Sequence, residues 1–313
     1  IRLLLSRDND YDVINLDKLT YAGNLDNLRD VEKNKHYGFI KGDVCNTNLV
    51  NKLMKNIDIV VNFAAETHVD RSIIEAGDFV KTDIIGTFIL LNAARKRNIK
   101  RFIHISTDEV YGSVERGSFN EDSALNPTNP YSASKAGADR LAYSYFKTFN
   151  LPVIIVRSSN NFGPYQHPEK LIPLFTTNAI ENKKLPLYGD GLNKREWIHV
   201  LDNCEAIYFL MNQGVKGEVY NVSTKDERTN LEITRMILKE LRKPESSIEF
   251  VKDRLAHDTR YSINVNKIKK LGWKPKYKFE KSLKETVRLY LNNECLWKKI
   301  KHGKFKEYYK RHY

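Results

Sequence analysis

The segment RFIHISTDEVYG, Arg101–Gly112, decides the fold, because an apolar run leads directly into a cluster of polar residues. Near-continuous apolar runs are typical of strands buried on both faces of a parallel sheet. Similar runs lie at Tyr11–Leu16, Tyr37–Lys41, Ile57–Phe63 and Pro152–Arg157. Helical patterns alternate with them, at Asn24–Glu32, Thr47–Lys55, Ile73–Asn98 and Tyr131–Asn150. The alternation predicts βαβ units in a doubly wound, parallel α/β sheet.

After Arg157 the pattern changes to shorter elements separated by turn signals such as Gly189-Asp190-Gly191. The expected strands are Leu185–Tyr188, Arg195–His199 and Glu218–Asn221, and the expected helices are Leu201–Gln213, Leu231–Arg242, Val265–Leu271 and Phe279–Lys299. This mixture predicts a smaller mixed α/β substrate lobe. We therefore expect a Rossmann-type domain over residues 1–157 and a substrate-binding lobe mainly over 158–313, with segments that return to the first domain.

Composition excludes several classes of protein. The 313 residues are 41% hydrophobic and 29% charged, which excludes a disordered chain. The three cysteines form no CxxC pair, so a disulfide framework and a thiolate zinc site are excluded, and we predict no bound metal. The longest apolar run, around Ile57–Ala65, is too short to cross a bilayer. We expect a cytoplasmic protein without a membrane partner.

The charge balance is basic, with 52 Lys+Arg against 39 Asp+Glu and a formal net charge of +13. Part of the excess lies near the C-terminus, at Lys298, Lys299, Lys301, Lys304, Lys306, Lys310 and Arg311. A solvated amphipathic helix explains this cluster, whereas a nucleic-acid footprint is the weaker alternative. We expect no nucleic-acid partner.

The beginning of the chain lacks one feature of a dinucleotide-binding fold. Ile1–Ser6 has a helical pattern, so Tyr11–Leu16 corresponds to a second strand, and no GxGxxG-type turn precedes it. That turn holds the pyrophosphate of a dinucleotide. We expect roughly 20 residues to precede Ile1 in the working protein, which an intact mass above that of the sequence would confirm.

Acidic and small residues follow the predicted strands. An acidic residue at Asp17 can accept hydrogen bonds from a ribose 2′-OH, which selects NAD over NADP, although a capping role is the alternative. Asp43 follows the next strand and could receive the adenine amino group. Phe63–Thr67 carries two alanines that allow a cofactor to approach the backbone, and His68 after it is more often a structural hydrogen-bonding residue than a ligand.

Tyr131 and Lys135 provide a further chemical signal. Residues four apart lie on one helix face, so the Lys135 ammonium can stabilise a Tyr131 phenolate and make it a base near neutral pH. The YxxxK pattern is common by chance, but its position after a strand that ends in Ser106-Thr107 is specific.

These motifs resemble the extended short-chain dehydrogenase/reductase superfamily, and the acidic pair Asp108-Glu109 is similar to that of the dTDP-glucose 4,6-dehydratases. Further segments carry the resemblance: NLDKLTYAGN, AAETHVDRSI, NPYSASKAGAD, SNNFGPYQHPEKLIP, YGDGLNKREWIHV and DRLAHDTRY. The resemblance implies a lyase of deoxysugar biosynthesis, such as that of dTDP-rhamnose, which oxidises C4 of dTDP-glucose with NAD, eliminates water across C5 and C6 and returns hydride to C6. It implies Glu109 as base, Asp108 as acid, and Thr107, Tyr131 and Lys135 at the 4-OH.

The resemblance also implies the remaining site residues. The expected NAD-binding residues are Asp17, Lys18, Leu19, Thr20, Asp43, Val44, Phe63, Ala64, Ala65, Glu66, Thr82, Tyr131, Lys135 and Asn161. The expected nucleotide-sugar contacts are Thr67, Thr107, Asn160, Lys170, Leu171, Pro186, Leu187, Tyr188, Arg195, Asn230, Asp253, Arg254 and His257. Arg195 suits a pyrophosphate because its planar guanidinium matches two oxygens, and an ion pair with Glu196 is the alternative.

Departures and alternatives remain. Leu255-Ala256 replaces the family's usual Pro-Gly, Asp83 and Glu196 replace the usual Asn and Asp, and none of the three is expected to touch the catalytic set. A UDP-sugar 4,6-dehydratase, an epimerase, a decarboxylase or a catalytically silent homologue are the alternative functions. The family forms homodimers through a four-helix bundle, which Asp78–Lys96 and Ala136–Phe149 would supply here. Along them Ile84, Phe88, Leu91, Leu141, Tyr145 and Phe149 recur at helical spacing, as an interface or a core face would.

Overall fold

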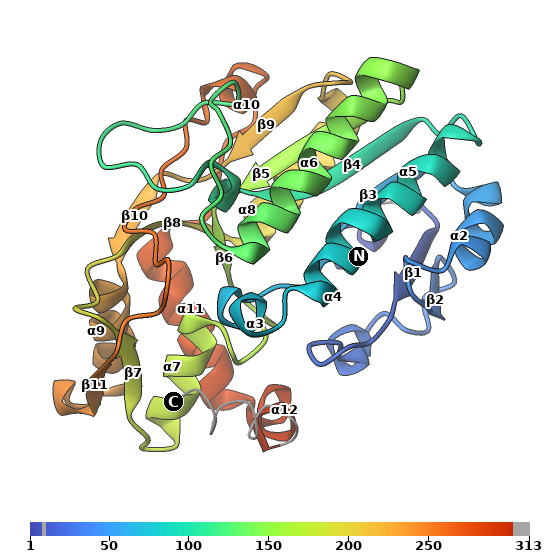
Figure 1. Cartoon of the computed structure of the whole chain (residues 1–313). Coiled ribbons are helices and arrows are strands. Elements are labelled where there is room, and N and C mark those ends of the chain that lie inside the picture. The colour runs from blue at the N-terminus through green and yellow to red at the C-terminus, as the bar shows by residue number, and fades with distance from the viewer. Residues whose placement is uncertain (8–10, 303–313) are drawn as a thin grey trace.

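The predicted parallel α/β class is confirmed by the computed structural model, which describes residues 1–7 and 11–302 (Figure 1). The central sheet holds four parallel strands in the order β3-β4-β5-β9. Their bounds are β3 Ile59–Asn62, β4 Arg101–Thr107, β5 Val153–Ser158 and β9 Val219–Val222. All four run the same way, so their carboxyl ends share one edge of the sheet, where ligands bind in this class of fold.

Two of the parallel strands form a sheet of their own within the described residues. Strands β1, Val13–Asp17, and β2, Tyr37–Lys41, form a separate parallel pair. Neither strand of the pair hydrogen-bonds to β3 in the described part of the chain. Strand β3 is accordingly less buried than the central strands. Only Asn62 of β3 is buried, whereas every residue of β5 is buried. The chain opens with the short helix α1, Arg2–Leu5, whose Leu4 packs against the core.

The β3-β4-β5-β9 sheet is covered on both faces. Phe102, Val153 and Ile155 belong to one core cluster with α5, Thr87–Arg95, and α6, Pro130–Phe149. Their chain neighbours, including Ile103 and Ile154, point the other way and join a second cluster with α8, Val200–Gln213. Successive side chains of a strand point to opposite faces, which explains why these strands are apolar throughout. Figure 1 shows α5 and α6 crossing the near face of the sheet.

Two predicted helices differ from the structure. Asn24–Glu32 contains only the 3-10 turn η1, Leu25–Leu28, which Asn24 caps by accepting a hydrogen bond from Asp26 N. The predicted helix Ile73–Asn98 is divided into α4, Gly77–Phe79, the π-helix η3, Val80–Gly86, and α5. Ahead of it lies α3, Val69–Ile74, and the earlier helix at Thr47 is α2, Thr47–Leu53, followed by η2, Met54–Asn56.

A second group of elements packs below the sheet in Figure 1 and has its own core. Helices α7, α9 and α11 contribute Phe175, Ile233, Ile237 and Leu283 to this core. Two small sheets complete it, in the orders β10-β8-β6 and β11-β7. Bounds are β6 Asn160–Phe162, α7 Leu171–Ile180, β7 Leu185–Tyr188, β8 Lys194–His199, β10 Asp226–Thr229, α9 Asn230–Leu241, η5 Glu245–Ser247, β11 Ile248–Val251 and α11 Phe279–Asn292. Helix α10, Asn266–Lys270, lies beside β9 instead, and its Ile268 joins a core cluster of the central sheet.

The predicted last helix ends at Asn292 and is followed by η6, Glu294–Leu296, and α12, Lys298–His302. The expectation that this basic segment is solvated is wrong for Lys301, which is 6% exposed. Its ammonium donates to Asn178 Oδ1 at 2.6 Å and Glu181 Oε2 at 2.7 Å, so burial is compensated by two partners. The basic residues from Lys304 onward lie outside the described residues. Within the described ranges, no helix combines the length and apolarity needed to cross a membrane.

Candidate active site

The acidic pair lies where β4 ends. Thr107 caps the 3-10 helix η4, Asp108–Tyr111, by accepting a hydrogen bond from Glu109 N at 3.3 Å. Gly112 then ends η4 with a φ of +77°, and a Cβ there would lie 2.4 Å from Asn126 O. Only glycine accommodates this close approach without strain. The sequence Thr-Asp-Glu-Val-Tyr-Gly therefore fixes two carboxyl groups at the ligand-binding edge of the sheet.

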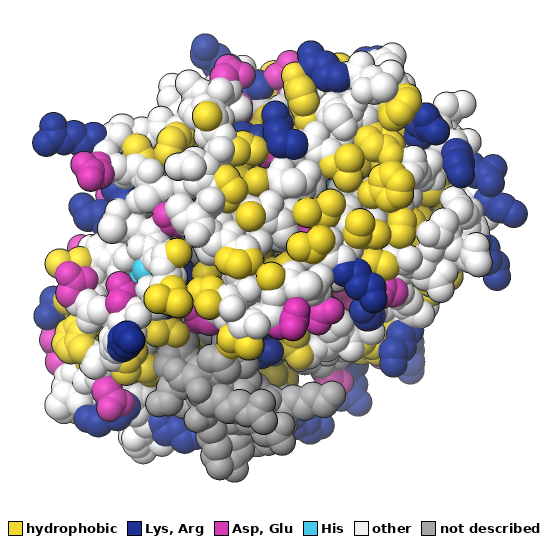
Figure 2. Space-filling model, viewed as in Figure 1, with side chains coloured by type: hydrophobic (Ala, Val, Ile, Leu, Met, Phe, Trp, Pro, Cys, Tyr) yellow, Lys and Arg dark blue, Asp and Glu magenta, His cyan; other side chains and the backbone are white. Residues whose placement is uncertain are grey.

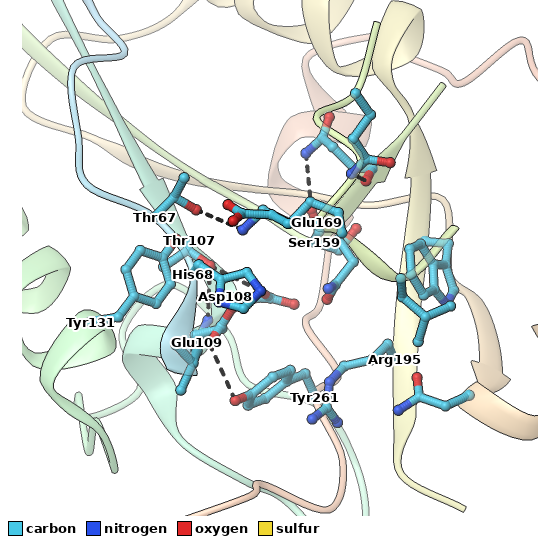
Figure 3. Close-up of a pocket in the computed structure, with 18 of the residues that line it drawn as sticks. Thr67, His68, Thr107, Asp108, Glu109, Tyr131, Ser159, Glu169, Arg195 and Tyr261 are labelled. Carbon is cyan, nitrogen blue, oxygen red and sulfur yellow. Dashed lines mark hydrogen bonds between the residues drawn. The ribbon is translucent and has the colours of Figure 1, made fainter. Parts of the chain in front are cut away.

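A cavity of about 380 Å³ opens above η4 between the sheet and the second group of elements. It brings together segments far apart in the chain, as Figure 3 shows for Thr67, Asp108 and Arg195. The predicted residues that line it are Thr67, Thr107, Asp108, Glu109, Tyr131, Asn160, Asn161, Lys170, Leu171, Pro186, Leu187, Tyr188, Arg195, Asn230, Arg254 and His257. Lys135, Asp253 and the other predicted cofactor residues do not line it.

The surroundings of Asp108 favour its protonated form. The residue is 2% exposed, and its Oδ2 has no hydrogen-bond partner within the described structure. Burial raises the pKa of Asp108 well above its usual value, and the Glu109 and Glu196 carboxylates raise it further. The Arg195 charge and a hydrogen bond from Thr107, at 3.2 Å, oppose this rise. Asp108 can therefore act as a proton donor at neutral pH.

Glu109 faces a different environment from its neighbour. Burial raises the pKa of Glu109, but the positive charges of Arg254, Arg195 and Lys170 all lower it. Tyr261 Oη donates to Asp258 Oδ2 at 2.6 Å and lies 3.5 Å from Glu109 Oε2 (Figure 3). The cations favour the ionised form of Glu109. Adjacent carboxyl groups in unlike environments can serve as an acid and a base at one pH.

Tyr131 and Lys135 lie in the first turns of α6. The helix begins with a capping box in which Asn129 and Ser132 satisfy each other's backbone N–H groups, and Pro130 follows as the first helical residue. Lys135 is 5% exposed and donates to Ile105 O at 2.6 Å. These contacts place both side chains beside the end of β4.

The surroundings of Tyr131 affect the pKa of its hydroxyl group. Burial raises the pKa of Tyr131 well above its usual value, and the carboxylates of Glu109, Asp83 and Asp108 raise it further. A hydrogen bond with Thr107 opposes this rise, and burial lowers the pKa of Lys135. Burial and the surrounding carboxylates disfavour the phenolate in this structure, and the role of Tyr131 as a base stays a prediction.

Cationic side chains surround the other walls of the cavity. Lys170 Nζ donates to Thr67 Oγ1 at 3.0 Å, and Arg254 lies 3.7 Å from Asp70. Arg195 donates to the carbonyls of Lys194 and Asp258, both at 2.8 Å, and its guanidinium stacks 4.2 Å above the Tyr261 ring. These cations make the cavity suitable for an anionic ligand.

The alternative reading of Arg195 as an ion-pair partner of Glu196 is wrong for the described structure. Glu196 accepts a hydrogen bond from Lys225 at 2.5 Å and from Ser223 and Ser262 at 2.7 Å. Arg195 stays directed at the cavity.

Several polar atoms of the cavity lack partners in the described structure. Asn160 Oδ1 and Asn161 Oδ1 are buried without a hydrogen bond, and so is Ser159 Oγ. Asn161 Nδ2 donates to Ser159 O at 3.0 Å, which orients its amide. Buried polar groups without partners are rare in folded proteins, so these atoms indicate a polar ligand.

Two residues of the predicted loop at Asp253–His257 interact with each other. His257 Nδ1 lies 2.5 Å from Asp253 Oδ1. Burial lowers the pKa of His257 to about 4. His257 therefore contributes a neutral ring to the cavity at pH 7. Arg260 pairs with Glu227 at 2.6 Å, so it fixes this loop and does not add charge to the cavity.

Several predicted cofactor residues lie at or just after the carboxyl ends of β1, β2 and β3. Asp17 Oδ1 accepts a hydrogen bond from Leu19 N at 2.7 Å, and its residue is exposed. Asp43 Oδ2 pairs with Lys18 Nζ at 2.8 Å, and Asp43 Oδ1 accepts a hydrogen bond from Cys45 N at 2.8 Å. An adenine amino group would compete with these two groups for the Asp43 carboxylate. Phe63, Ala64 and Ala65 follow β3, where Phe63 is 58% exposed. Thr82 lies in η3, and Val44 is buried beneath it against Gly86.

These positions fit the two ends of a dinucleotide. The exposed Asp17 carboxylate suits an adenosine ribose, and Tyr131 with Lys135 suits the ribose of a nicotinamide. The alanines after β3 leave room between these ends. The described residues hold no glycine-rich turn for the pyrophosphate, as the sequence already shows.

Sequence reasoning missed several residues that line the cavity. Tyr261 and Glu169 are 2% and 3% exposed, and Glu169 accepts hydrogen bonds from Tyr21 Oη at 2.8 Å and Arg71 Nε at 3.1 Å. His68, taken as structural, lines the cavity with a φ of +96°, which is unusual for a non-glycine residue. Their motifs, PEKLIP, DTRY and ETHVD, can be seen in the sequence. The sequence does not show that the side chains of these motifs face one cavity.

Comparison with known proteins agrees with this site. Residues 1–286 match the family model described as GDP-mannose 4,6 dehydratase. The chain is 50% identical over 294 residues to the low-salt glycan biosynthesis protein Agl12 of Haloferax volcanii, covering 94% of each. It is 46% identical over 287 residues to a dTDP-glucose 4,6-dehydratase of Streptomyces niveus, covering 91% of this chain and 85% of that protein.

A solved structure of DesIV, the dTDP-glucose 4,6-dehydratase of Streptomyces venezuelae with NAD and TYD bound, superposes with a TM-score of 0.94 at 46% identity, covering 96% of this chain and 94% of that one. The resemblance predicted from the sequence is confirmed. This chain therefore belongs to the GDP-mannose 4,6 dehydratase family, among relatives that include the dTDP-glucose 4,6-dehydratases.

Proposed function

We propose that this protein converts dTDP-glucose to dTDP-4-keto-6-deoxyglucose with NAD as a regenerated cofactor. The observation that carries the proposal is the buried pair Asp108 and Glu109, whose environments favour one protonated and one ionised carboxyl group. Elimination of water from a 4-keto sugar needs this combination, because one group removes a proton as the other supplies one.

Glu109 is the proposed base at C5. Burial raises the pKa of Glu109, and the cations of Arg254, Arg195 and Lys170 oppose this rise and so favour the carboxylate. Asp108 is the proposed acid, which donates its proton to the departing C6 hydroxyl. Its unpartnered Oδ2 is available for this contact. A 4-keto group acidifies the C5 proton, so both carboxyl groups act only after C4 has been oxidised.

Tyr131 and Thr107 are the proposed partners of the 4-OH. Thr107 would hydrogen-bond the C4 oxygen, and Tyr131 would take its proton, with Lys135 beside it. When bound, NAD supplies the hydride acceptor at C4 and the donor at C6. A positive charge brought close to Tyr131 by the bound cofactor would offset the carboxylates that raise its pKa.

The nucleoside diphosphate is the proposed ligand of the second group of elements. Lys170, Arg195 and Arg254 supply positive charge for the diphosphate. Pro186 and Leu187 supply an apolar surface for the nucleoside, and Asn230 supplies a polar group. Thymidine is proposed because the relatives named above include dTDP-glucose 4,6-dehydratases. A cytoplasmic location and a place in dTDP-deoxysugar synthesis, such as that of dTDP-rhamnose, follow from this substrate.

The test is incubation of the NAD-loaded enzyme with dTDP-glucose in deuterated water, followed by NMR and mass spectrometry. A 4-keto-6-deoxy product with deuterium at C5 and no net reduced cofactor is expected. Turnover of UDP- or GDP-sugars alone would keep the mechanism and change the nucleotide. Inversion at C4 or release of CO₂ would favour an epimerase or a decarboxylase, and inertness throughout would favour a silent homologue.

We also propose a homodimer formed through α5 and α6. The sequence analysis left open whether six apolar residues of these helices form an interface or a core face. Two of them, Leu91 and Tyr145, are 0% and 6% exposed and belong to the core. Phe88 and Phe149 are 43% and 45% exposed. Figure 2 shows hydrophobic side chains gathered over the face that carries α4, α5 and α6. An exposed apolar face of this kind supports self-association.

A further inference from the structure

Asp83 is a buried carboxyl group to which no role has been given above. It lies in η3, which joins α4 to α5 alongside α6 (Figure 1). The residue is 1% exposed. Its Oδ1 accepts a hydrogen bond from Glu66 N at 2.9 Å, and its Oδ2 lies 2.6 Å from Ser134 Oγ. Asp83 makes no hydrogen bond to the predicted catalytic residues in the described structure, but its partner Ser134 stands between Tyr131 and Lys135 in the sequence.

The hydrogen atoms around Ser134 indicate the protonation state of Asp83. Ser134 Oγ also lies 2.8 Å from the carbonyl oxygen of Tyr131, which can only accept. A serine hydroxyl has one proton, so an ionised Asp83 and the Tyr131 carbonyl would compete for it. A protonated Asp83 removes the competition: Oδ2–H donates to Ser134 Oγ, and the Ser134 hydroxyl donates to Tyr131 O.

We propose that Asp83 is a positioning residue that holds the first turn of α6 as a neutral carboxylic acid, through a hydrogen-bond chain from Asp83 to Ser134 to the Tyr131 carbonyl. Its other oxygen binds the backbone of Glu66, next to the cavity residue Thr67. The carboxyl group thus links the segment after β3 to the turn that presents Tyr131. Only the kinetic part of the test below rests on the proposed function.

The groups around Asp83 act on its protonation in opposite directions. Tyr131 and Lys135 face it from α6, and Glu66 faces it from the segment after β3. Burial raises the pKa of Asp83, whereas the charge of Lys135 and the hydrogen bonds from Ser134 and Glu66 N lower it. An ionised Asp83 raises the pKa of Tyr131. A neutral Asp83 removes that obstacle to the loss of the phenolic proton.

The first test is infrared spectroscopy of the full-length protein at neutral pH, which needs no substrate. Asp83→Asn keeps the size of the side chain and supplies N–H in place of O–H. We expect its spectrum to lose intensity in the carbonyl-stretch band of protonated carboxyl groups relative to the wild type. The control Asp78→Asn, at an exposed position on neighbouring α4, should lose intensity in the carboxylate band. A loss of carboxylate intensity in Asp83→Asn would overturn the proposal.

The second test is kinetic. Asp83→Ala breaks the chain and should lower kcat on the order of tenfold or more through displacement of Tyr131, with KM for the nucleotide sugar changed by less than about twofold. Asp83→Asn should restore most of the lost kcat because it can donate to Ser134. Equal defects in the two variants would contradict the proposal. If Asp83→Ala does not fold, the infrared comparison with Asp83→Asn decides.

Discussion

At the scale of single residues, Asp108 and Glu109 show how neighbouring side chains of one chemical type acquire different properties. They are adjacent in sequence and share η4, yet Asp108 has a buried oxygen without a partner while Glu109 faces three cations. The difference arises from the elements that pack over η4. Burial disfavours the charged form of a carboxyl group, whereas nearby cations favour it.

Substitution of the pair should separate the two proton transfers. Asp108→Asn removes the acid but leaves the base, and general acid catalysis contributes on the order of 10²- to 10⁴-fold to kcat. Substrate recovered from this variant in deuterated water should carry deuterium at C5. Glu109→Gln should lower kcat comparably and leave C5 without deuterium. Equal isotope content in both recovered substrates would contradict the assignment of roles.

Asp108 should also lower the free energy of unfolding at neutral and higher pH. Because its folded pKa is raised above the unfolded value, its favourable contribution is complete below the unfolded pKa and is lost as pH rises through the folded pKa. Asp108→Asn should therefore raise Tm at pH 8, where about 1 kcal/mol corresponds to roughly 2–4 °C. The gain should shrink toward pH 4 in thermal unfolding followed by circular dichroism. A gain independent of pH would show that charge is not its cause.

At the scale of elements, the N-terminus of α6 links the stability of this helix to the position of Tyr131 in the site. Asn129 accepts from Ser132 N at 2.9 Å, and the catalytic candidate Tyr131 lies within the same turn. Helix caps are stabilising because they satisfy N–H groups that have no partner within the helix. The first turn of α6 is therefore held both by its cap and by Ser134.

Removal of this cap should affect stability and turnover together. Asn129→Ala should lower the free energy of unfolding by about 1 kcal/mol, as other cap substitutions do, and should also lower kcat. The matched control is Asn46→Ala at α2, where Asn46 accepts from Leu49 N at 3.1 Å and does not line the cavity. It should lose similar stability in urea unfolding but keep kcat at saturating NAD. Equal loss of kcat in the two variants would contradict the coupling.

At the scale of the whole molecule, the site lies between two differently built parts. The sheet supplies Thr107, Asp108 and Glu109, whereas Lys170, Arg195 and Arg254 come from segments after residue 158. The predicted domain boundary at residue 157 stays a prediction. The later segments supply the carboxyl group of Glu169 as well as these three cations.

The exposed face of α5 and α6 yields the prediction at this scale. Phe88→Asp places a charge in the proposed interface and should convert the dimer to a monomer in light scattering coupled to gel filtration. Phe250→Asp is the control, since Phe250 on β11 is 59% exposed but lies on the other group of elements. That variant should keep the mass of the wild type. A monomeric wild type, or a dimeric Phe88→Asp, would contradict the proposed interface.

Much of the fold was predictable because its signals are local. Tyr37–Lys41 is a strand with the predicted bounds, and the predicted helix Tyr131–Asn150 differs from α6 by one residue at each end. Short polar strands were missed, as at Asp226–Thr229, because this strand exists only through antiparallel pairing with β8. The predicted helix at Asn24–Glu32 is reduced to the 3-10 turn η1 in the structure.

The sequence by itself determined the α/β class, the residues of the acidic pair and the Tyr131–Lys135 spacing, because apolar periodicity and helical geometry act over a few residues. Only the tertiary structure decided which groups meet. It placed Tyr261 beside Glu109 across 152 positions and Lys170 against Thr67 across 103. It also buried Lys301 and aligned Asp83 with Ser134. Burial and long-range charge set protonation, and neither is a property of a local segment.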